Sequence, residues 1–144
     1  MRKLKRQRQN DAANQPNDVT YVQTPNAPLP AGHYSQAVVH NGVVYVAGLL
    51  PIDAATGEKC FGDIEAQTHL VLKNLATVLS AAESDLSLVL KTTVYVSDVG
   101  LWENVNAVYA AVFGTHRPAR TVVPVKELHY GFLIELDAIA ATRS

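Results

Sequence analysis

The sequence predicts an α+β domain in which two helices pack on one face of a single sheet. Three observations support this: an Asn-Gly turn between two β-branched stretches, two stretches with helical spacing of apolar residues, and a last strand with two largely apolar faces. The expected order of elements is β-β-α-β-α-β-β. Because two helices cannot cover both faces of such a sheet, the other face needs a different partner.

The first two strands form a hairpin over residues 37–46. Two runs of β-branched residues meet at Asn41-Gly42, a pair that tolerates the positive φ angles required at both centres of a tight hairpin turn. Pro51 and the loop at residues 53–57 then end the second strand.

The first helix is expected between Asp63, as its N-cap, and about Ala82. Its apolar residues recur at helical spacing along one stripe, which consists of Val71, Leu75, Val78, Leu79 and Ala82. This spacing predicts one amphipathic helix that buries a single face.

A strand and a second helix follow. Residues 89–96 are rich in Val, Thr and Tyr, as is typical of a strand, and Asp98 is the expected cap of the next helix. The apolar stripe of that helix consists of Trp102, Val105, Tyr109 and Val112. Gly114 and Pro118 end it.

Two further strands are expected at about residues 120–125 and 132–141. In the last one, alternate residues form two faces: Phe132, Ile134, Leu136, Ala138 and Ala140 on one, and Leu133, Glu135, Asp137, Ile139 and Ala141 on the other. Neither face is polar in the way that a solvated face would be. We therefore expect another copy of the chain to cover much of the sheet opposite the helices.

The bulk composition sets limits on the function. A chain of 144 residues fits one domain, which we expect at residues 19–144, and its net charge of −1 gives no long-range attraction to nucleic acid. The single cysteine, Cys60, excludes an intrachain disulfide. No apolar run approaches the ~20 residues needed to cross a bilayer. Polar residues follow the basic N-terminus where a secretory signal would need an apolar segment, so no such signal is expected. A cytoplasmic location and no membrane partner are the expectation.

The first 18 residues form a basic and polar tail with almost nothing to bury, so disorder is expected there. Five basic residues lie between Arg2 and Arg8 and are the only sequence support for an action on RNA. Solvated tails of this composition are far more common than RNA-binding ones, so nucleic acid is not expected as a partner.

Two residues could carry chemistry. Arg120 begins a strand, and its guanidinium fork suits a carboxylate, while Glu135 lies mid-strand where partial desolvation could let it polarise a water. The alternative from sequence is a structural ion pair between the two. The histidines are scattered without metal-ligand spacing, so no metal site is expected.

Several segments, in order along the chain, resemble the Rid (reactive intermediate deaminase) family, also called the YjgF family. They are residues 30–37, 46–51, 56–57, 91–98, 105–109, 118–121 and 134–140. The most specific are Pro118-Ala119-Arg120 and the last strand. The resemblance covers about residues 24–141.

The resemblance implies a chorismate-mutase-like subunit with a mixed sheet. Three subunits would form a homotrimer with a site in each cleft between them. The implied reaction, which uses no cofactor, is hydrolysis of enamine and imine intermediates such as 2-iminobutanoate and 2-iminopropanoate to 2-keto acids and ammonia.

The resemblance also assigns roles to residues. Arg120 would anchor the substrate carboxylate, and Glu135 would hold or activate the attacking water. Tyr34 would close the site through its hydroxyl, and Asn106 would give a supporting hydrogen bond. The substrate would also contact Ala47 and the backbone of Val122.

Four positions depart from the family pattern. Ala47 and Leu49 stand where active members commonly have Ser or Thr and then Gln, Val122 replaces a common Cys, and His33 replaces the usual Pro. The missing hydroxyl at Ala47 favours a second hypothesis, a non-catalytic or regulatory protein that binds a small carboxylate. A third hypothesis is the translational inhibition through RNA that is attached to some relatives.

Overall fold

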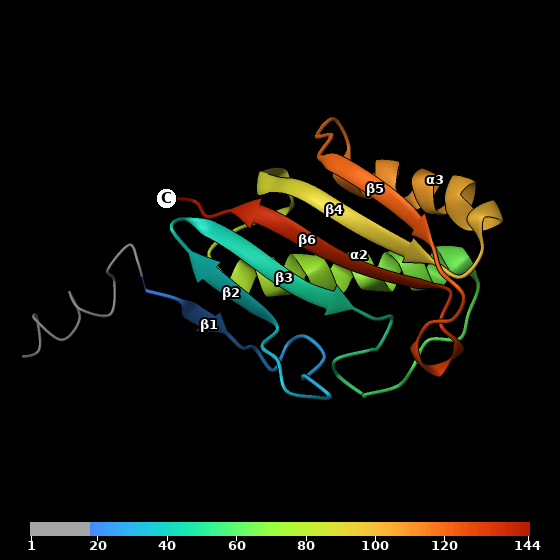
Figure 1. The fold of residues 1–144 in the computed structure, drawn as a ribbon, viewed down its shortest axis with the longest axis horizontal. Coiled ribbons are helices and arrows are strands. Elements are labelled where there is room, and N and C mark those ends of the chain that lie inside the picture. Colours follow the sequence, from blue (N-terminus) through green and yellow to red (C-terminus); the bar gives the residue numbers. More distant parts are fainter. Residues whose placement is uncertain (1–17) are drawn as a thin grey trace, which may run out of the picture.

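The computed structural model describes residues 18–144, so the disorder predicted for the tail falls on residues that lie, apart from Asp18, outside the described part. Residues 18–144 form six strands and two helices, whose arrangement can be followed in Figure 1. The strands are β1 (Thr20–Val22), β2 (Ala37–His40), β3 (Val43–Leu49), β4 (Val89–Val96), β5 (Ala119–Pro124) and β6 (Ile134–Ala141). The helices are α2 (Ile64–Ala81) and α3 (Trp102–Phe113), with short 3₁₀ turns η1 (Leu86–Leu88), η2 (Val99–Leu101) and η3 (His129–Gly131).

All six strands form one mixed sheet in the order β1-β2-β3-β6-β4-β5. The pair β4 and β5, joined through α3, is parallel, and every other neighbouring pair is antiparallel. The last strand therefore lies between β3 and β4, near the centre of the sheet (Figure 1). This arrangement confirms the predicted α+β fold.

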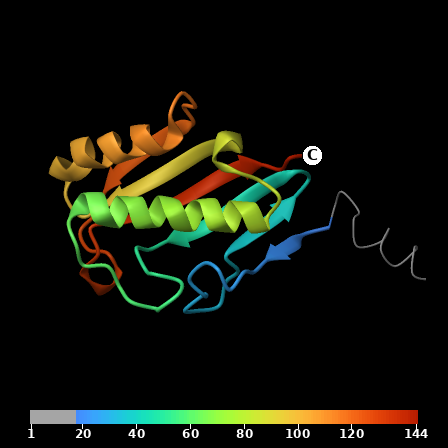
Figure 2. The same ribbon diagram turned by 180° about the vertical axis from the view of Figure 1, so that it is seen from behind.

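Both helices lie on the same face of the sheet, as Figure 2 shows from the helix side. The core fills the space between these layers, and α2 contributes Val71, Leu72, Leu75, Val78 and Leu79 to it. From β6, Ile134, Leu136, Ala138 and Ala140 are buried on the same side. The alternation predicted for the last strand is confirmed from Ile134 to Ala141, whereas Phe132 and Leu133 precede the strand and Leu133 packs against the core.

The predicted turn and cap are also present. Asn41 and Gly42 have φ angles of 50° and 75°, as the hairpin requires. Asp63 caps α2, because its side chain accepts a hydrogen bond from the backbone N–H of Ala66 at 2.9 Å.

Three details differ from the sequence prediction. Strand β1 was not predicted; it pairs with β2 at the edge of the sheet. Asp98 caps the turn η2, which leads into α3, rather than α3 itself. Trp102 does not belong to the buried stripe: it is the first residue of α3 and is 42% exposed, whereas Val108 and Phe113 are buried.

The face of the sheet opposite the helices, here called the open face, carries an apolar row across four strands. In this row Tyr21 pairs with Val38, Val38 with Tyr45, and Tyr45 with Ile139. Tyr21 and Tyr45 are 72% and 46% exposed. Nothing within residues 18–144 covers this row.

Within residues 18–144, neither helix is both long and apolar enough to span a bilayer.

Candidate functional site

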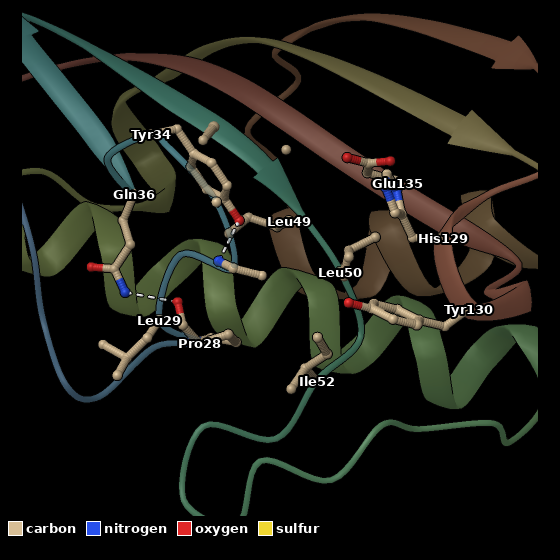
Figure 3. Close-up of a pocket in the computed structure, with 14 residues that line it drawn as sticks. Pro28, Leu29, Tyr34, Gln36, Leu49, Leu50, Ile52, His129, Tyr130 and Glu135 are labelled. Atoms are coloured by element: carbon tan, nitrogen blue, oxygen red, sulfur yellow. Dashed lines mark hydrogen bonds between the residues drawn. The ribbon is translucent and has the colours of Figure 1, made fainter.

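A pocket of about 420 Å³ opens where β3 ends beside the start of β6. Its walls come from three segments far apart in sequence, at residues 28–36, 47–52 and 129–130, together with Glu135 on β6. Figure 3 shows the side chains of these segments around the pocket. Three predicted site residues, Tyr34, Ala47 and Glu135, line it together.

Glu135 is the carboxyl group among the residues that line this pocket. Its side chain is half-buried, and burial raises the pKa of its carboxyl above the ordinary value. The charge of His129 opposes this rise in the pKa and that of Asp137 adds to it. A carboxylate with a raised pKa is a stronger base, which suits it to take a proton from water near neutral pH.

Gly48 leaves the space that the Glu135 carboxylate occupies. A Cβ atom at Gly48 would collide with Oε1 of Glu135, and its distance to Cδ would be only 3.3 Å. The pairing of β3 with β6 produces this close approach. Sequence reasoning named the residues on either side of Gly48 but gave the glycine itself no role, because the contact is between distant segments.

Tyr34 is 52% exposed, and its side chain folds back onto the loop that precedes it. Its hydroxyl accepts a hydrogen bond from the backbone N–H of Ala31 at 3.3 Å (Figure 3). His33, which precedes it, does not line the pocket. The tyrosine ring therefore stands at the rim, on a loop held in a tight turn.

Gln36 anchors that loop and was missed by sequence reasoning. Its side chain is buried; Oε1 accepts from the N–H of Thr24 at 2.7 Å, and Nε2 donates to the carbonyls of Thr24 and Pro28 at 3.0 and 2.8 Å (Figure 3). A single glutamine before a strand gives no sequence signal of such burial.

Arg120 lies elsewhere in the subunit, against α3. Its Nη1 donates to Oδ1 of Asn106 at 2.9 Å, and its guanidinium carbon is 4.8 Å from the ring centroid of Tyr109. The structure therefore joins two predicted site residues, Arg120 and Asn106. The side chain of the predicted contact Val122 is partly buried and packs against the core.

Arg120 and Glu135 project from opposite faces of the sheet. Arg120 pairs with Thr92, whose hydroxyl lies 2.8 Å from that of Tyr109 on the helix side. Glu135 pairs with Tyr95, three positions further along β4, so its side chain emerges on the open face. Within residues 18–144 the ion pair joins Arg143 to Asp85, so the structural pair between Arg120 and Glu135 is not formed.

The open face carries a second carboxylate near Glu135. The hydroxyl of Tyr95 donates to Oδ2 of Asp137 at 3.2 Å. Burial raises the pKa of Tyr95, with further contributions from Asp137 and Glu135. Within residues 18–144, no three His, Cys, Asp or Glu side chains cluster in a way that would hold a metal ion.

Comparison with known proteins identifies the family. The family model described as Endoribonuclease L-PSP matches residues 24–142, nearly the whole described chain. The chain belongs to the YjgF/Rid family.

The matches between this Rid protein and its relatives span most of each relative's length. A RutC family protein of Pyrococcus horikoshii is 46% identical over 117 residues, which are 81% of this chain and 93% of that protein. The rat protein named 2-iminobutanoate/2-iminopropanoate deaminase is 37% identical over 119 residues, which are 83% of this chain and 87% of that protein. A crystal structure of the Rid protein YyfA from Yersinia pestis, described as of unknown function, has 40% identity and a TM-score of 0.84, covering 87% of this chain and 100% of that one.

The departures from the Rid pattern fall in different places. Ala47 lines the pocket without a hydroxyl, whereas Leu49 is a buried core residue that also lines the pocket. The missing polar groups make this pocket more apolar than the family pattern implies.

Proposed function

We propose that this protein hydrolyses 2-imino acids, such as 2-iminobutanoate and 2-iminopropanoate, to 2-keto acids and ammonia. The observation that carries the proposal is the half-buried Glu135, whose raised pKa makes it a base in a pocket shared with Tyr34. The name of the rat relative, at 37% identity, supports the same chemistry.

We place the complete site between copies of the chain, in a cytoplasmic homotrimer. Arg120 and Glu135 emerge on opposite faces of one subunit, so both can meet one small substrate only if they come from different copies. The uncovered apolar row on the open face supports association, because such a surface is costly to leave in water.

Arg120 would hold the carboxylate of the substrate. Asn106 and the ring of Tyr109 orient its guanidinium, which restricts the side chain before the substrate arrives. A fixed guanidinium loses less conformational entropy on binding and can make two parallel hydrogen bonds. The result would be an imine carbon held in one position next to Glu135 of the neighbouring copy.

Glu135 would then move two protons. Its carboxylate accepts a proton from water as the water oxygen bonds to the imine carbon and the C=N π electrons move to nitrogen. The carboxyl next returns this proton to the nitrogen, which gives a neutral carbinolamine. The carboxylate then takes the proton of the added hydroxyl and passes it to the amine nitrogen, so that the C=O bond forms as the C–N bond breaks and NH3 leaves. One water and one imine give one keto group and one ammonia.

A direct test generates the imine in place. A pyridoxal-phosphate dehydratase acting on threonine releases 2-iminobutanoate, which semicarbazide traps unless it is first hydrolysed. The protein should reduce semicarbazone formation and speed keto-acid release, whereas Glu135→Gln should not. The wild type giving no more acceleration than buffer would remove the deaminase proposal.

Ala47 favours one alternative, a non-catalytic protein that binds a small carboxylate. Without a hydroxyl at this position, the pocket has one fewer group to position a water. Calorimetric binding of 2-oxobutanoate in the absence of turnover would support this alternative. The third hypothesis, action on RNA, depends on Arg2 to Arg8, which lie outside the described residues, and stays a prediction.

A further inference from the structure

The pocket is lined by two kinds of side chain. Polar groups come from Glu135, Tyr34, His129 and Gln36. A second group of lining residues, here called the apolar wall, consists of Leu29, Leu50, Ile52 and the ring of Tyr130. In Figure 3 the wall runs along the lower edge of the pocket, below Glu135 and Tyr34. Leu29 and Tyr130 stand at its two ends and are 64% and 54% exposed.

Tyr130 is held in place although it is exposed. Its backbone has a φ of 59°, a conformation that bulky residues rarely adopt and that costs free energy. The Nζ atom of Lys59 lies 4.6 Å from the centroid of its ring, and the ring packs edge-on against Phe132 at 5.7 Å. The contacts compensate for the strained backbone and keep the ring at the pocket.

The ring behind Tyr130 is itself buried. Phe132 is buried, and Phe61 stacks on it with ring centroids 5.4 Å apart. The exposed ring of Tyr130 therefore packs against a buried neighbour. A wall arranged in this way before binding loses little side-chain conformational entropy when it binds an apolar group.

We infer that the apolar wall binds the side chain of the substrate and that the protein prefers 2-imino acids with large apolar side chains. The inference rests on the deaminase function proposed above. With the imine carbon at Glu135 and the carboxylate at Arg120 of a second copy, the remaining substituent has the wall to fill. A methyl group leaves most of that wall in water, whereas a leucine-type side chain covers it.

The hydroxyl of Tyr130 also points into the pocket (Figure 3). The ring and the hydroxyl are separable by substitution. Tyr130→Phe removes only the hydroxyl and keeps the ring with its contact to Phe132. Tyr130→Ala removes the hydroxyl and the ring. If the wall acts through apolar contact, only Tyr130→Ala changes the preference.

The experiment compares imines that differ only in side chain. An L-amino acid oxidase with catalase generates them from leucine, alanine and glutamate, and semicarbazide trapping reports hydrolysis. For the wild type, kcat/KM on the leucine-derived imine should exceed that on the alanine-derived imine by about tenfold or more. Tyr130→Ala should lower this ratio about tenfold, and Tyr130→Phe should retain it.

A second variant and a binding measurement test the apolar wall independently of Tyr130→Ala. Leu29→Ser, at the other end of the wall, should lower the same ratio, and trimer mass and circular dichroism check that each variant folds. In calorimetry, 4-methyl-2-oxopentanoate should bind the wild type more tightly than pyruvate does, independently of turnover.

The outcomes separate the two proposals. Equal rates on leucine- and alanine-derived imines, a preference for the glutamate-derived imine, or an unchanged ratio in both Tyr130→Ala and Leu29→Ser overturns the preference and leaves the deaminase proposal standing. No acceleration on any imine removes the deaminase proposal and this inference with it.

Discussion

Arg120 and Glu135 project from opposite faces of the sheet in one subunit. Arg120 lies on the helix side with Asn106 and Tyr109, and Glu135 lines a pocket on the open face. Edge strand β5 presents the first, and β6, near the sheet centre, presents the second. The proposed deaminase activity depends on two copies of the chain bringing these side chains together.

Removing the guanidinium should weaken productive binding. Arg120→Ala loses a charge-assisted, two-point contact with the substrate carboxylate. Productive binding should weaken by about 2 kcal/mol or more, which lowers kcat/KM for 2-iminobutanoate roughly thirtyfold. Arg117→Ala, at an exposed arginine three residues earlier, is the matched control and should retain wild-type kinetics. Unchanged kinetics in Arg120→Ala would exclude this residue from the site.

The pH dependence of kcat/KM should report the carboxyl of Glu135. Glu135 is active as the carboxylate, so activity should fall as the pH drops through its pKa, which burial raises. His129→Gln removes a positive charge that lowers this pKa, so the acid limb should move to higher pH. A limb that stays in place or moves to lower pH would contradict the assignment of Glu135 as the base.

Gly48→Ala should damage turnover through Glu135 alone. The added Cβ collides with Oε1, so the carboxylate must leave its position, and the expected result is a large fall in kcat with the trimer intact. A double-mutant cycle checks the route: Gly48→Ala should cost little more when Glu135→Gln is already present. Additive losses in the cycle would show that Gly48 acts elsewhere.

Gln36→Leu should destabilise the fold. The change leaves the N–H of Thr24 and the carbonyls of Thr24 and Pro28 without their side-chain partners in a buried place. We expect a loss of about 1–3 kcal/mol in the free energy of unfolding, measured in urea. A variant as stable as the wild type would mean that water or the backbone replaces these hydrogen bonds.

Regular elements with local signals could be predicted from the sequence. Asn41-Gly42 specifies its own turn, Asp63 caps α2, and the alternation along β6 correctly separates Glu135 from the buried residues. These features depend on neighbours within a few positions. Strand β1 has only three residues and no periodic pattern, so it could not be recognised without its pairing to β2.

The site was only partly predictable because its geometry depends on long-range pairing. The start of a strand says nothing about which face Arg120 occupies; its register with Thr92 decides this. Gly48 meets Glu135 only through the pairing of β3 with β6. Tyr130 reaches the pocket through a left-handed backbone that sequence patterns do not indicate for a tyrosine.

Mixed trimers test most directly whether two copies share one site. Subunits carrying Arg120→Ala and Glu135→Gln are each nearly inactive alone, but in a randomly mixed trimer roughly a quarter of the clefts receive both intact side chains. We predict that co-assembled variants recover about that fraction of wild-type deaminase activity. Mixed trimers, verified by mass, that remain as inactive as their parents would contradict the shared site.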